Sequence, residues 1–271
     1  MSKSIKVHVS GWLQRSWARA MARPSTQKLN TFIHLLSLRG LGVMNYESEE
    51  LSGEEAWSVA YVKHVPDAVV FDVGANVGRY AQFLTKEVPG VRIHAFEPHP
   101  KNFSRLSDGL RSSSVTCIQA AVGECRGELS LYDYSDQEGS SHASLYKEAI
   151  SDLRNSEVKA LSVPVLTLDE YCRKNGVERI SLLKIDTEGN ELKCLLGAGE
   201  MLKQGRIDAV LFEFNEMNVF SGATFKKFWD LLQGYKIYRL LPGGKLLEVK
   251  QYVPATCEIY AYQNIVALRR R

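Results

Sequence analysis

The most constraining feature of this sequence is an alternation of strand and helix patterns that begins near residue 68. Residues 68–73 (AVVFDV) and 91–97 (VRIHAFE) are short apolar runs bounded by glycine or proline, and a helical pattern over residues 77–87 separates them. A strand, a helix and a second strand in this order are typical of a βαβ unit with parallel strands. We therefore expect an α/β fold.

The alternation continues through the rest of the chain. Proline in the first turn opens a helix after His99, and Thr167 with Glu170 forms a capping box for a helix that ends near residue 176. Further strands are predicted over residues 114–122, 127–134, 180–186, 209–214, 236–241 and 257–268. This pattern predicts a doubly wound, mostly parallel sheet with an antiparallel C-terminal strand pair. In such sheets ligands bind at the carboxyl ends of the strands.

Length and composition fit one globular domain with an extension. The chain has 271 residues, of which 45% are hydrophobic. We expect a helical N-terminal extension over residues 1–64 and a ligand-binding domain over residues 65–271.

The net charge of the chain, +3, is too small to indicate nucleic-acid binding. Five cysteines without a C-x-x-C pair favour neither a disulfide framework nor a zinc site, and no apolar run is long enough for a bilayer. We expect a soluble, cytoplasmic protein.

The N-terminal segment has an unusual charge distribution. Residues 1–46 contain seven basic residues and no acidic one. Trp12 and Trp17 can share a helix face, with Arg15 and Arg19 opposite, which suits contact with a membrane surface or a transit peptide. The favoured alternative is a helix that packs its tryptophans on the main domain.

The sharpest local signal is FDVGANVGRY, which joins the first predicted strand to its helix. Glycines at 74 and 78 allow a ligand to approach the backbone closely. A nicotinamide dinucleotide fingerprint reads G-x-G-x-x-G, whereas this loop reads G-x-N-x-G with Asp72 just before it. A carboxylate at that point would repel a phosphate. It suits a cationic ligand, and the methionine part of S-adenosylmethionine carries an ammonium and a sulfonium.

A second acidic residue follows at the end of the next predicted strand. Glu97 lies twenty-five residues after Asp72, in the segment AFEP. A carboxylate at this place in a doubly wound sheet can accept hydrogen bonds from both ribose hydroxyls. Asp72 and Glu97 together indicate a nucleoside-containing ligand, although either carboxylate could instead cap a loop.

Three segments resemble one known family. DVGANVGRY, KIDTEGNEL and the upstream SGEE are similar to segments of the FkbM-type methyltransferases, and the resemblance runs from about residue 38 to 268. It implies a class I, Rossmann-like methyltransferase fold, S-adenosylmethionine as the donor and O-methylation of a sugar, glycan or polyketide hydroxyl. Carried over by position, it implies a cofactor site formed by Asp72, Gly74, Asn76, Gly78 and Glu97.

The adenine contact stays open at this point. After the third predicted strand the chain reads IQAAVGE, which offers the side chain of Gln119 and backbone groups at Ala120 instead of an acidic side chain. We expect adenine to lie near these two residues.

The predicted acceptor side begins at the strand over residues 180–186. It places Lys184, Asp186 and Glu188 at the edge of the sheet where ligands bind. A hydroxyl loses a proton as it attacks a methyl group, so a carboxylate within reach can act as a general base. We expect Asp186 in that role, with Glu188 and Glu213 orienting the acceptor. The structural alternative is an ion pair between Lys184 and Asp186.

Other interpretations use the same residues. Asp186, Glu188 and Glu213 with Asn215 could collect magnesium, although we assign no metal ligand. His99 and His142 are alternative bases, and the serines beside His142 are candidate contacts. A nicotinamide-dependent oxidoreductase and a noncatalytic S-adenosylmethionine-binding module are the alternative functions. We expect a small-molecule or carbohydrate acceptor and no nucleic acid, and the oligomeric state is left open.

Overall fold

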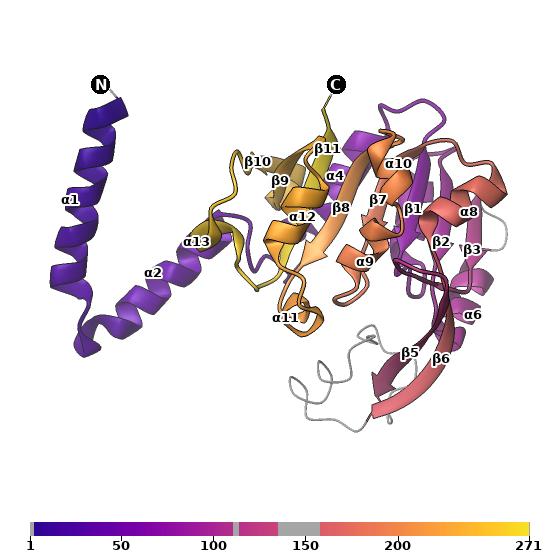
Figure 1. The fold of residues 1–271 in the computed structure, drawn as a ribbon, viewed down its shortest axis with the longest axis horizontal. Helices are drawn as coiled ribbons and strands as arrows, with labels where there is room; N and C mark the ends of the chain where they lie inside the picture. Colours follow the sequence, from indigo (N-terminus) through magenta and orange to yellow (C-terminus); the bar gives the residue numbers. More distant parts are fainter. Residues whose placement is uncertain (1–2, 111–113, 135–157, 271) are drawn as a thin grey trace. The chain divides into compact units, whose positions relative to one another are not determined.

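The computed structural model describes residues 3–110, 114–134 and 158–270 and divides the chain into two compact units (Figure 1). The first unit is Met1–Leu41 and the second, which we call the main unit, is Gly42–Arg271. Residues 42–64, counted with the N-terminal extension on sequence alone, belong to the main unit. Among the described residues, no helix has both the length and the apolar character needed to cross a membrane.

The N-terminal unit consists of two helices joined by a short 3₁₀ turn. They are α1 (Lys3–Met21) and α2 (Gln27–Gly40), with η1 (Pro24–Thr26) between them. The Thr26 hydroxyl and the Asn30 amide both donate to the carbonyl of Met21, at 2.5 and 2.8 Å, and so fix the end of α1 against the start of α2. Trp12 and Trp17 are 62% and 51% exposed.

The main unit alternates strands and helices as the sequence pattern predicts. Its helices are α3 (Glu49–Ser52), α4 (Glu54–Val62), α5 (Arg79–Glu87), α6 (Pro100–Gly109), α8 (Leu168–Asn175), α9 (Glu191–Leu196), α10 (Gly199–Lys203), α11 (Met217–Ser221), α12 (Phe225–Leu231) and α13 (Pro254–Cys257). Its strands are β1 (Val69–Val73), β2 (Arg92–Phe96), β3 (Val115–Ile118), β4 (Ala121–Val122), β5 (Gly127–Tyr134), β6 (Val158–Leu166), β7 (Ile180–Ile185), β8 (Ile207–Phe214), β9 (Tyr235–Leu241), β10 (Lys245–Glu248) and β11 (Gln263–Arg269). A 3₁₀ turn, η2 (Pro242–Gly244), joins β9 to β10.

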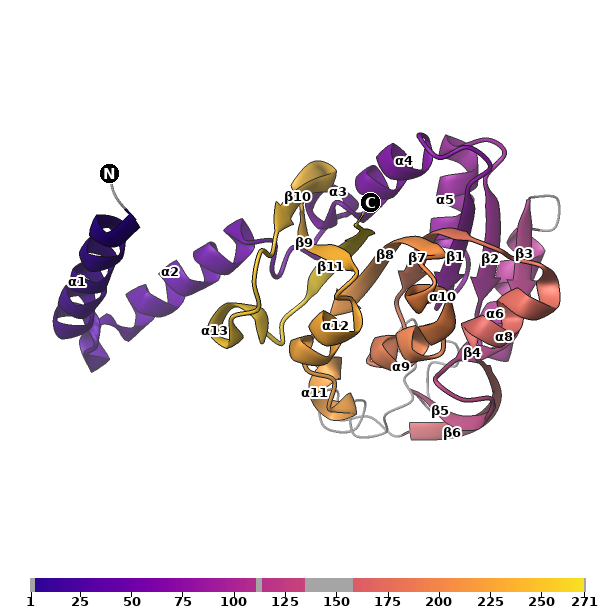
Figure 2. The same ribbon diagram turned by 45° about the horizontal axis from the view of Figure 1, so that its top comes forward.

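Eight strands form the central sheet, in the order β10-β9-β11-β8-β7-β1-β2-β3 (Figures 1 and 2). The strands from β8 to β3 are parallel, whereas β11 is antiparallel to both β8 and β9, and β10 is antiparallel to β9. The predicted mostly parallel sheet with antiparallel strands near the C-terminus is therefore confirmed. A second sheet has the order β4-β6-β5.

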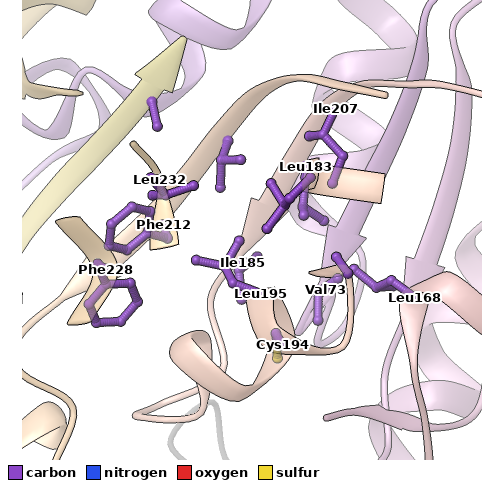
Figure 3. Close-up of a cluster of buried hydrophobic side chains, with 14 of the residues drawn as sticks. Val73, Leu168, Leu183, Ile185, Cys194, Leu195, Ile207, Phe212, Phe228 and Leu232 are labelled. Carbon is purple, nitrogen blue, oxygen red and sulfur yellow. The ribbon is translucent and has the colours of Figure 1, made fainter. Parts of the chain in front are cut away.

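Helices cover both faces of the central sheet, each over its own apolar cluster. On one face Phe71, Leu183 and Phe212 pack with residues of α8, α9, α10 and α12. Figure 3 shows part of this cluster, including Leu183, Phe212 and Phe228. On the other face Val70 and Leu182 pack with residues of α4, α5 and α6. Side chains alternate between the two faces along each strand. Asp72 and Lys184 therefore continue the rows of Val70 and Leu182, on the face covered by α4 and α5.

Two predicted strands differ from the structure. Residues 114–122 do not form one strand, because the chain turns at residues 119–120, where the amide of Ala120 donates to the carbonyl of Ile118, and β4 joins the second sheet. Residues 257–262 precede β11 instead of belonging to it. The helical turn α13 begins at Pro254, which lacks an amide hydrogen, and ends at the buried residue Cys257, so the strand can begin only after this turn.

Candidate active site

The glycine-rich loop after β1 packs directly against the loop after β7. Gly74, Asn76 and Gly78 have left-handed backbones, with φ of 84°, 50° and 85°. A Cβ on Gly74 would lie 1.8 Å from the carbonyl oxygen of Asp186, so no other residue fits there without a backbone shift. The amides of Gly74 and Ala75 both donate to the carbonyl of Phe96, which joins the loop to β2 as well.

Glu97, at the end of β2, is a buried carboxylate held by two backbone amides. Its Oε2 accepts from the amide of Asn76 and its Oε1 from the amide of His99, both at 2.8 Å. These bonds fix the carboxylate between the β1 loop and the start of α6.

A pocket lies against this carboxylate, with about 590 Å³ of empty space that is partly open to solvent; we call it the first cavity. Apolar and small residues form one part of its wall, and the residues of the two loops form the other: Val73, Gly74, Asn76, Phe96, Glu97, Pro98, Asn102, Ala120, Ala121, Val122, Leu131, Asp186, Thr187, Glu188 and Asn190. Within the described residues, the side-chain oxygens of Asn102 and Asn190 are buried without a hydrogen-bond partner. A buried amide oxygen without a partner is costly, so these two atoms indicate a ligand that donates hydrogen bonds.

Lys184 organises a buried cluster of charges beside that cavity. Asp72 and Lys184 are direct neighbours in the β1–β7 register, and Lys184 Nζ lies 3.3 Å from Asp72 Oδ1, 3.5 Å from Asp186 Oδ2 and 3.8 Å from Glu54 Oε1. It also lies 5.1 Å from the centre of the Tyr80 ring. Three carboxylates thus surround one ammonium, which leaves an excess of negative charge.

Burial and charge shift the pKa values in this cluster. Burial raises the pKa of Glu54 to about 7, with Lys184 opposing and the charges of Asp186 and Asp72 adding to the rise. Burial likewise raises the pKa of Asp72 above its ordinary value. The pKa of Lys184 lies well above its ordinary value, because the attraction of Asp72, Asp186 and Glu54 outweighs the opposing effect of burial. Lys184 therefore stays protonated at neutral pH.

A second hollow, of about 1010 Å³, opens on the other side of the same loops. Its wall includes Glu54, Arg79 and Lys184, and it shares Gly74, Asn76 and Asp186 with the first cavity. Of the predicted site residues that the structure describes, Asp186 is the one whose ionisable side chain lines both hollows. Its side chain is 43% exposed, in contrast to the buried Asp72.

A buried glutamate shapes the loop from Asp186 to Asn190. Glu191 Oε1 accepts from the amides of Thr187 and Gly189 and from the Thr187 hydroxyl, at 3.0 to 3.1 Å, and its Oε2 accepts from Asn218 at 3.3 Å. Burial raises the pKa of Glu191 to about 7 despite these donors. The bonds hold Glu188 in a left-handed conformation with φ of 51°.

Glu213 lies one strand further along the same edge, on the face that carries Lys184. Its carboxylate accepts from the side chain of Asn215, and Asn264 is its partner in the register with β11. Burial and the charges of Asp186, Glu188 and Glu191 raise the pKa of Glu213 well above its ordinary value. Burial, and then the charges of Glu213, Glu54 and Asp186, raise the pKa of Tyr262.

The structure brings most of the predicted residues to one edge of the sheet. Asp72, Gly74, Asn76, Glu97, Ala120, Lys184, Asp186 and Glu188 line one of the two hollows or contact residues that do. Gln119 is exposed and lines neither, and Gly78 packs at the start of α5, where a Cβ would lie 2.7 Å from Leu106. His99 is a buried helix cap. His142 and its neighbouring serines lie outside the described residues.

The described residues hold no metal-binding cluster, and three residues at the site had no role in the sequence prediction. Within the described ranges, no three His, Cys, Asp or Glu side chains gather as a metal site would require, and Asp186, Glu188 and Glu213 do not form such a group. Glu54, Asn102 and Asn190 were not predicted as site residues. Glu54 stands in SGEE and Asn190 in KIDTEGNEL, two of the segments that carried the resemblance, whereas nothing in the sequence marks Asn102.

Comparison with known proteins is consistent with this geometry. Residues 72–237 match the family described as "Methyltransferase FkbM domain". The chain is 31% identical over 176 residues to the 31-O-demethyl-FK506 methyltransferase FkbM of Streptomyces tacrolimicus, which covers 56% of this chain and 67% of that protein. It is 24% identical over 189 residues to the 2-O-methyltransferase NoeI of Sinorhizobium fredii (66% and 76%) and 25% identical over 139 residues to the hexuronic acid methyltransferase AglP of Haloferax volcanii (51% and 52%).

Proposed function

The chain belongs to the FkbM methyltransferase family, and from this premise we propose that it transfers a methyl group to a hydroxyl oxygen of a sugar, glycan or polyketide-like acceptor. It is an S-adenosylmethionine-dependent methyltransferase. The observation that carries the proposal is the position of Asp186, a carboxylate that borders both hollows at the carboxyl edge of the sheet.

The first cavity has the donor and acceptor groups that the nucleoside part of S-adenosylmethionine requires. Glu97 supplies a carboxylate for the ribose hydroxyls, as acidic residues at the end of the second strand do in doubly wound folds. Ala120 and Val122 provide a narrow apolar wall for adenine. The unpartnered oxygens of Asn102 and Asn190 can accept hydrogen bonds from its amino group.

The charges around Lys184 suit the other end of the cofactor. Glu54, Asp72 and Asp186 exceed the single ammonium of Lys184 in charge, so the cluster attracts cations. The methionine part of S-adenosylmethionine carries two positive charges and one negative. We infer that Glu54 faces its ammonium and that Lys184 opposes the effect of burial on the pKa of Asp72.

In the proposed reaction, the chain positions the acceptor and removes its proton. S-adenosylmethionine supplies an electrophilic methyl group on a sulfonium that leaves as a neutral thioether, so no acid is needed for the leaving group. Asp186 accepts the hydroxyl proton as the acceptor oxygen attacks. Glu188 and Glu213 orient the acceptor, and the Glu191 hydrogen bonds keep the loop that carries Asp186 and Glu188 in one conformation.

The names of the relatives support an oxygen acceptor. One is a 2-O-methyltransferase, and another is named for the 31-O position of FK506. A third is a hexuronic acid methyltransferase, which supports a carbohydrate acceptor. A nicotinamide-dependent oxidoreductase has no support from the loop sequence G-x-N-x-G or from these relatives.

The test is to incubate the full chain with isotopically labelled S-adenosylmethionine and a panel of monosaccharides, glycans and polyketide alcohols. Mass spectrometry should detect one labelled methyl group per product, and NMR should locate it on oxygen. Transfer to nitrogen or carbon would contradict the proposal, as would binding of NADH without binding of S-adenosylmethionine.

The donor site has a separate test. Glu97→Gln removes a charge but keeps the size of the side chain, so calorimetry should show about 10- to 100-fold weaker binding of S-adenosylmethionine and S-adenosylhomocysteine. Glu124→Gln, at an exposed position after β4, is the matched control and should leave both affinities unchanged. Equal affinities in the two variants would remove Glu97 from the cofactor site.

A further inference from the structure

Helix α2 presents a continuous apolar stripe to solvent. Leu29, Phe32, Ile33 and Leu36 are spaced i, i+3, i+4 and i+7, so they lie on one side of the helix. Their side chains are 40% to 59% exposed. We call these four residues the α2 stripe. Contiguous exposed apolar surface is uncommon on soluble proteins and marks a contact site.

Helix α1 adds large aromatic side chains to the same unit. Trp12, Leu13 and Trp17 are all more than half exposed. Tryptophan is enriched where one side of a structure is apolar and the other wet, because its ring is amphipathic. The hydrogen bonds of Thr26 and Asn30 to Met21 join the two helices through an ordered turn, so both belong to one contact region.

The charge of this segment defines the chemistry of its partner. Residues 1–46 carry seven basic residues and no acidic one, whereas residues 47–271 carry 27 basic and 31 acidic residues. Arg15, Arg19, Arg23 and Lys28 are exposed in the N-terminal unit. A partner that accepts apolar side chains and attracts this many cations is both apolar and anionic, which describes the headgroup region of an anionic bilayer.

We propose that α1 and α2 bind the surface of an anionic lipid membrane. The apolar side chains of Trp12, Trp17 and the α2 stripe enter the boundary between headgroups and acyl chains, and the arginines contact lipid phosphates. The helices lie in the plane of the interface, since neither is long and apolar enough to span a bilayer. Nucleic acid is also anionic, but a phosphate backbone offers no apolar partner for the α2 stripe.

The experiment is co-sedimentation of the full chain with vesicles of phosphatidylcholine, either alone or with about 30% phosphatidylglycerol, a fraction typical of such assays. We expect partitioning onto the anionic vesicles, weak partitioning onto neutral ones, and a decrease as salt rises. Each basic residue near such a surface is worth about fivefold in partitioning. The variant with Arg15→Gln, Arg19→Gln and Arg23→Gln should therefore lose about 100-fold.

Matched variants test whether vesicle binding depends on the charged and apolar residues of the N-terminal unit or on those of the whole chain. Lys236→Gln with Lys245→Gln and Lys250→Gln removes as many exposed charges from the main unit and should leave partitioning unchanged. Phe32→Ser with Leu36→Ser should reduce it at least about tenfold. Leu129→Ser, at an exposed position of β5, should have no effect. Circular dichroism checks that each variant is folded.

Four outcomes would overturn the proposal. One is the absence of binding to anionic vesicles by the folded chain, and another is equal partitioning of all the variants. The third is a concentration-dependent dimer that Phe32→Ser with Leu36→Ser abolishes while vesicle binding is absent, which would assign the α2 stripe to a second copy of the chain. Binding to duplex DNA that survives these two substitutions would point to a phosphate site instead.

Discussion

At the scale of single residues, Glu54 should couple cofactor binding to a proton. Its carboxyl has a pKa of about 7 in the free protein, so near pH 7 it is partly protonated. A bound cation favours the carboxylate and lowers that pKa. We expect S-adenosylmethionine to release a fraction of a proton at pH 7 and to bind more tightly as pH rises from 6 to 8, which calorimetry in buffers of different ionisation enthalpy would measure.

The control for this coupling is a neutral amide at the same place. Glu54→Gln should bind S-adenosylmethionine with no proton release in this pH range, whereas Glu50→Gln, at an exposed position of α3, should behave as the unmodified chain. Proton release that persists in Glu54→Gln would assign the coupling to another group of the cluster, such as Asp72.

Asp186 should act on turnover and not on cofactor affinity. Asp186→Asn keeps the size and hydrogen-bonding reach of the side chain but cannot accept a proton. A general base contributes about 10²- to 10⁴-fold, so kcat with saturating acceptor should fall by that factor while S-adenosylmethionine affinity stays within a few fold. Stopped assays and calorimetry on one preparation measure both.

Two results would change the role of Asp186. Full turnover in Asp186→Asn would leave it an ion-pair partner of Lys184 and move the search for a base to Glu188 or Glu213. Loss of activity in chelator, restored by magnesium, would assign it to a metal site.

The predictability of the site differs from residue to residue. Asp72, Gly74, Asn76 and Glu97 were predictable because a short loop and the strand end beside it place them through local chain geometry. Asn190 lies in KIDTEGNEL, but its role does not follow from the local pattern, because its side-chain amide donates to the carbonyl of Val122, sixty-eight residues away, and leaves its oxygen without a partner within the described residues. Long-range contacts of this kind leave no local pattern.

At the scale of elements, the approach of the β1 and β7 loops depends on Gly74. Gly74→Ala combines a strained φ of 84° with a Cβ that overlaps the carbonyl of Asp186. Gly90→Ala has the same strain, with φ of 87°, but no atom within 4 Å of the new Cβ. We expect Gly90→Ala to lower the free energy of unfolding by about 1 kcal/mol, and Gly74→Ala by at least about 2 kcal/mol more.

Urea unfolding of the two variants measures that difference. Calorimetry should also show weaker binding of S-adenosylmethionine by Gly74→Ala, since the loop must move, and normal binding by Gly90→Ala. Equal unfolding free energies would mean that the two loops can separate without cost.

The elements themselves were predicted unevenly, and the errors have physical causes. Strands β1, β2, β7 and β8 are buried runs with clear boundaries, and Thr167 caps α8 as expected, with its side chain accepting from the amide of Glu170. The break between β3 and β4 was missed because residues 115–122 are apolar on both sides of the turn. The two strands differ only in the sheet that each joins, because β3 pairs in the central sheet and β4 in the second sheet. The hydropathy of a strand does not indicate which sheet it joins.

At the scale of the whole molecule, the main unit should be more stable in mild acid than in mild base. The folded-state pKa of Glu191, like that of Glu54, is raised from 4.5 to about 7. A carboxyl group with a raised folded-state pKa makes its full contribution to stability below its unfolded-state pKa, where it is protonated in both states. That contribution is lost as pH rises through the folded-state pKa of about 7. Each shift corresponds to up to about 3 kcal/mol.

We therefore expect a higher melting temperature at pH 5.5 than at pH 8 for the protein without cofactor. Glu191→Gln keeps an oxygen for the amides of Thr187 and Gly189 and should reduce the difference, whereas Glu200→Gln, at an exposed position of α10, should not. A melting temperature that rises from pH 5.5 to pH 8 would contradict the shifts.

The place of β11 in the sheet has a consequence for how the protein is made. This strand follows every other strand of the central sheet in the sequence, yet it lies between β8 and β9 and pairs with both. On the ribosome, β8 and β9 therefore emerge with open backbone edges that β11 closes only later. Unpaired strand edges recruit other chains, so the nascent protein passes through an interval in which it is open to aggregation and to chaperone binding.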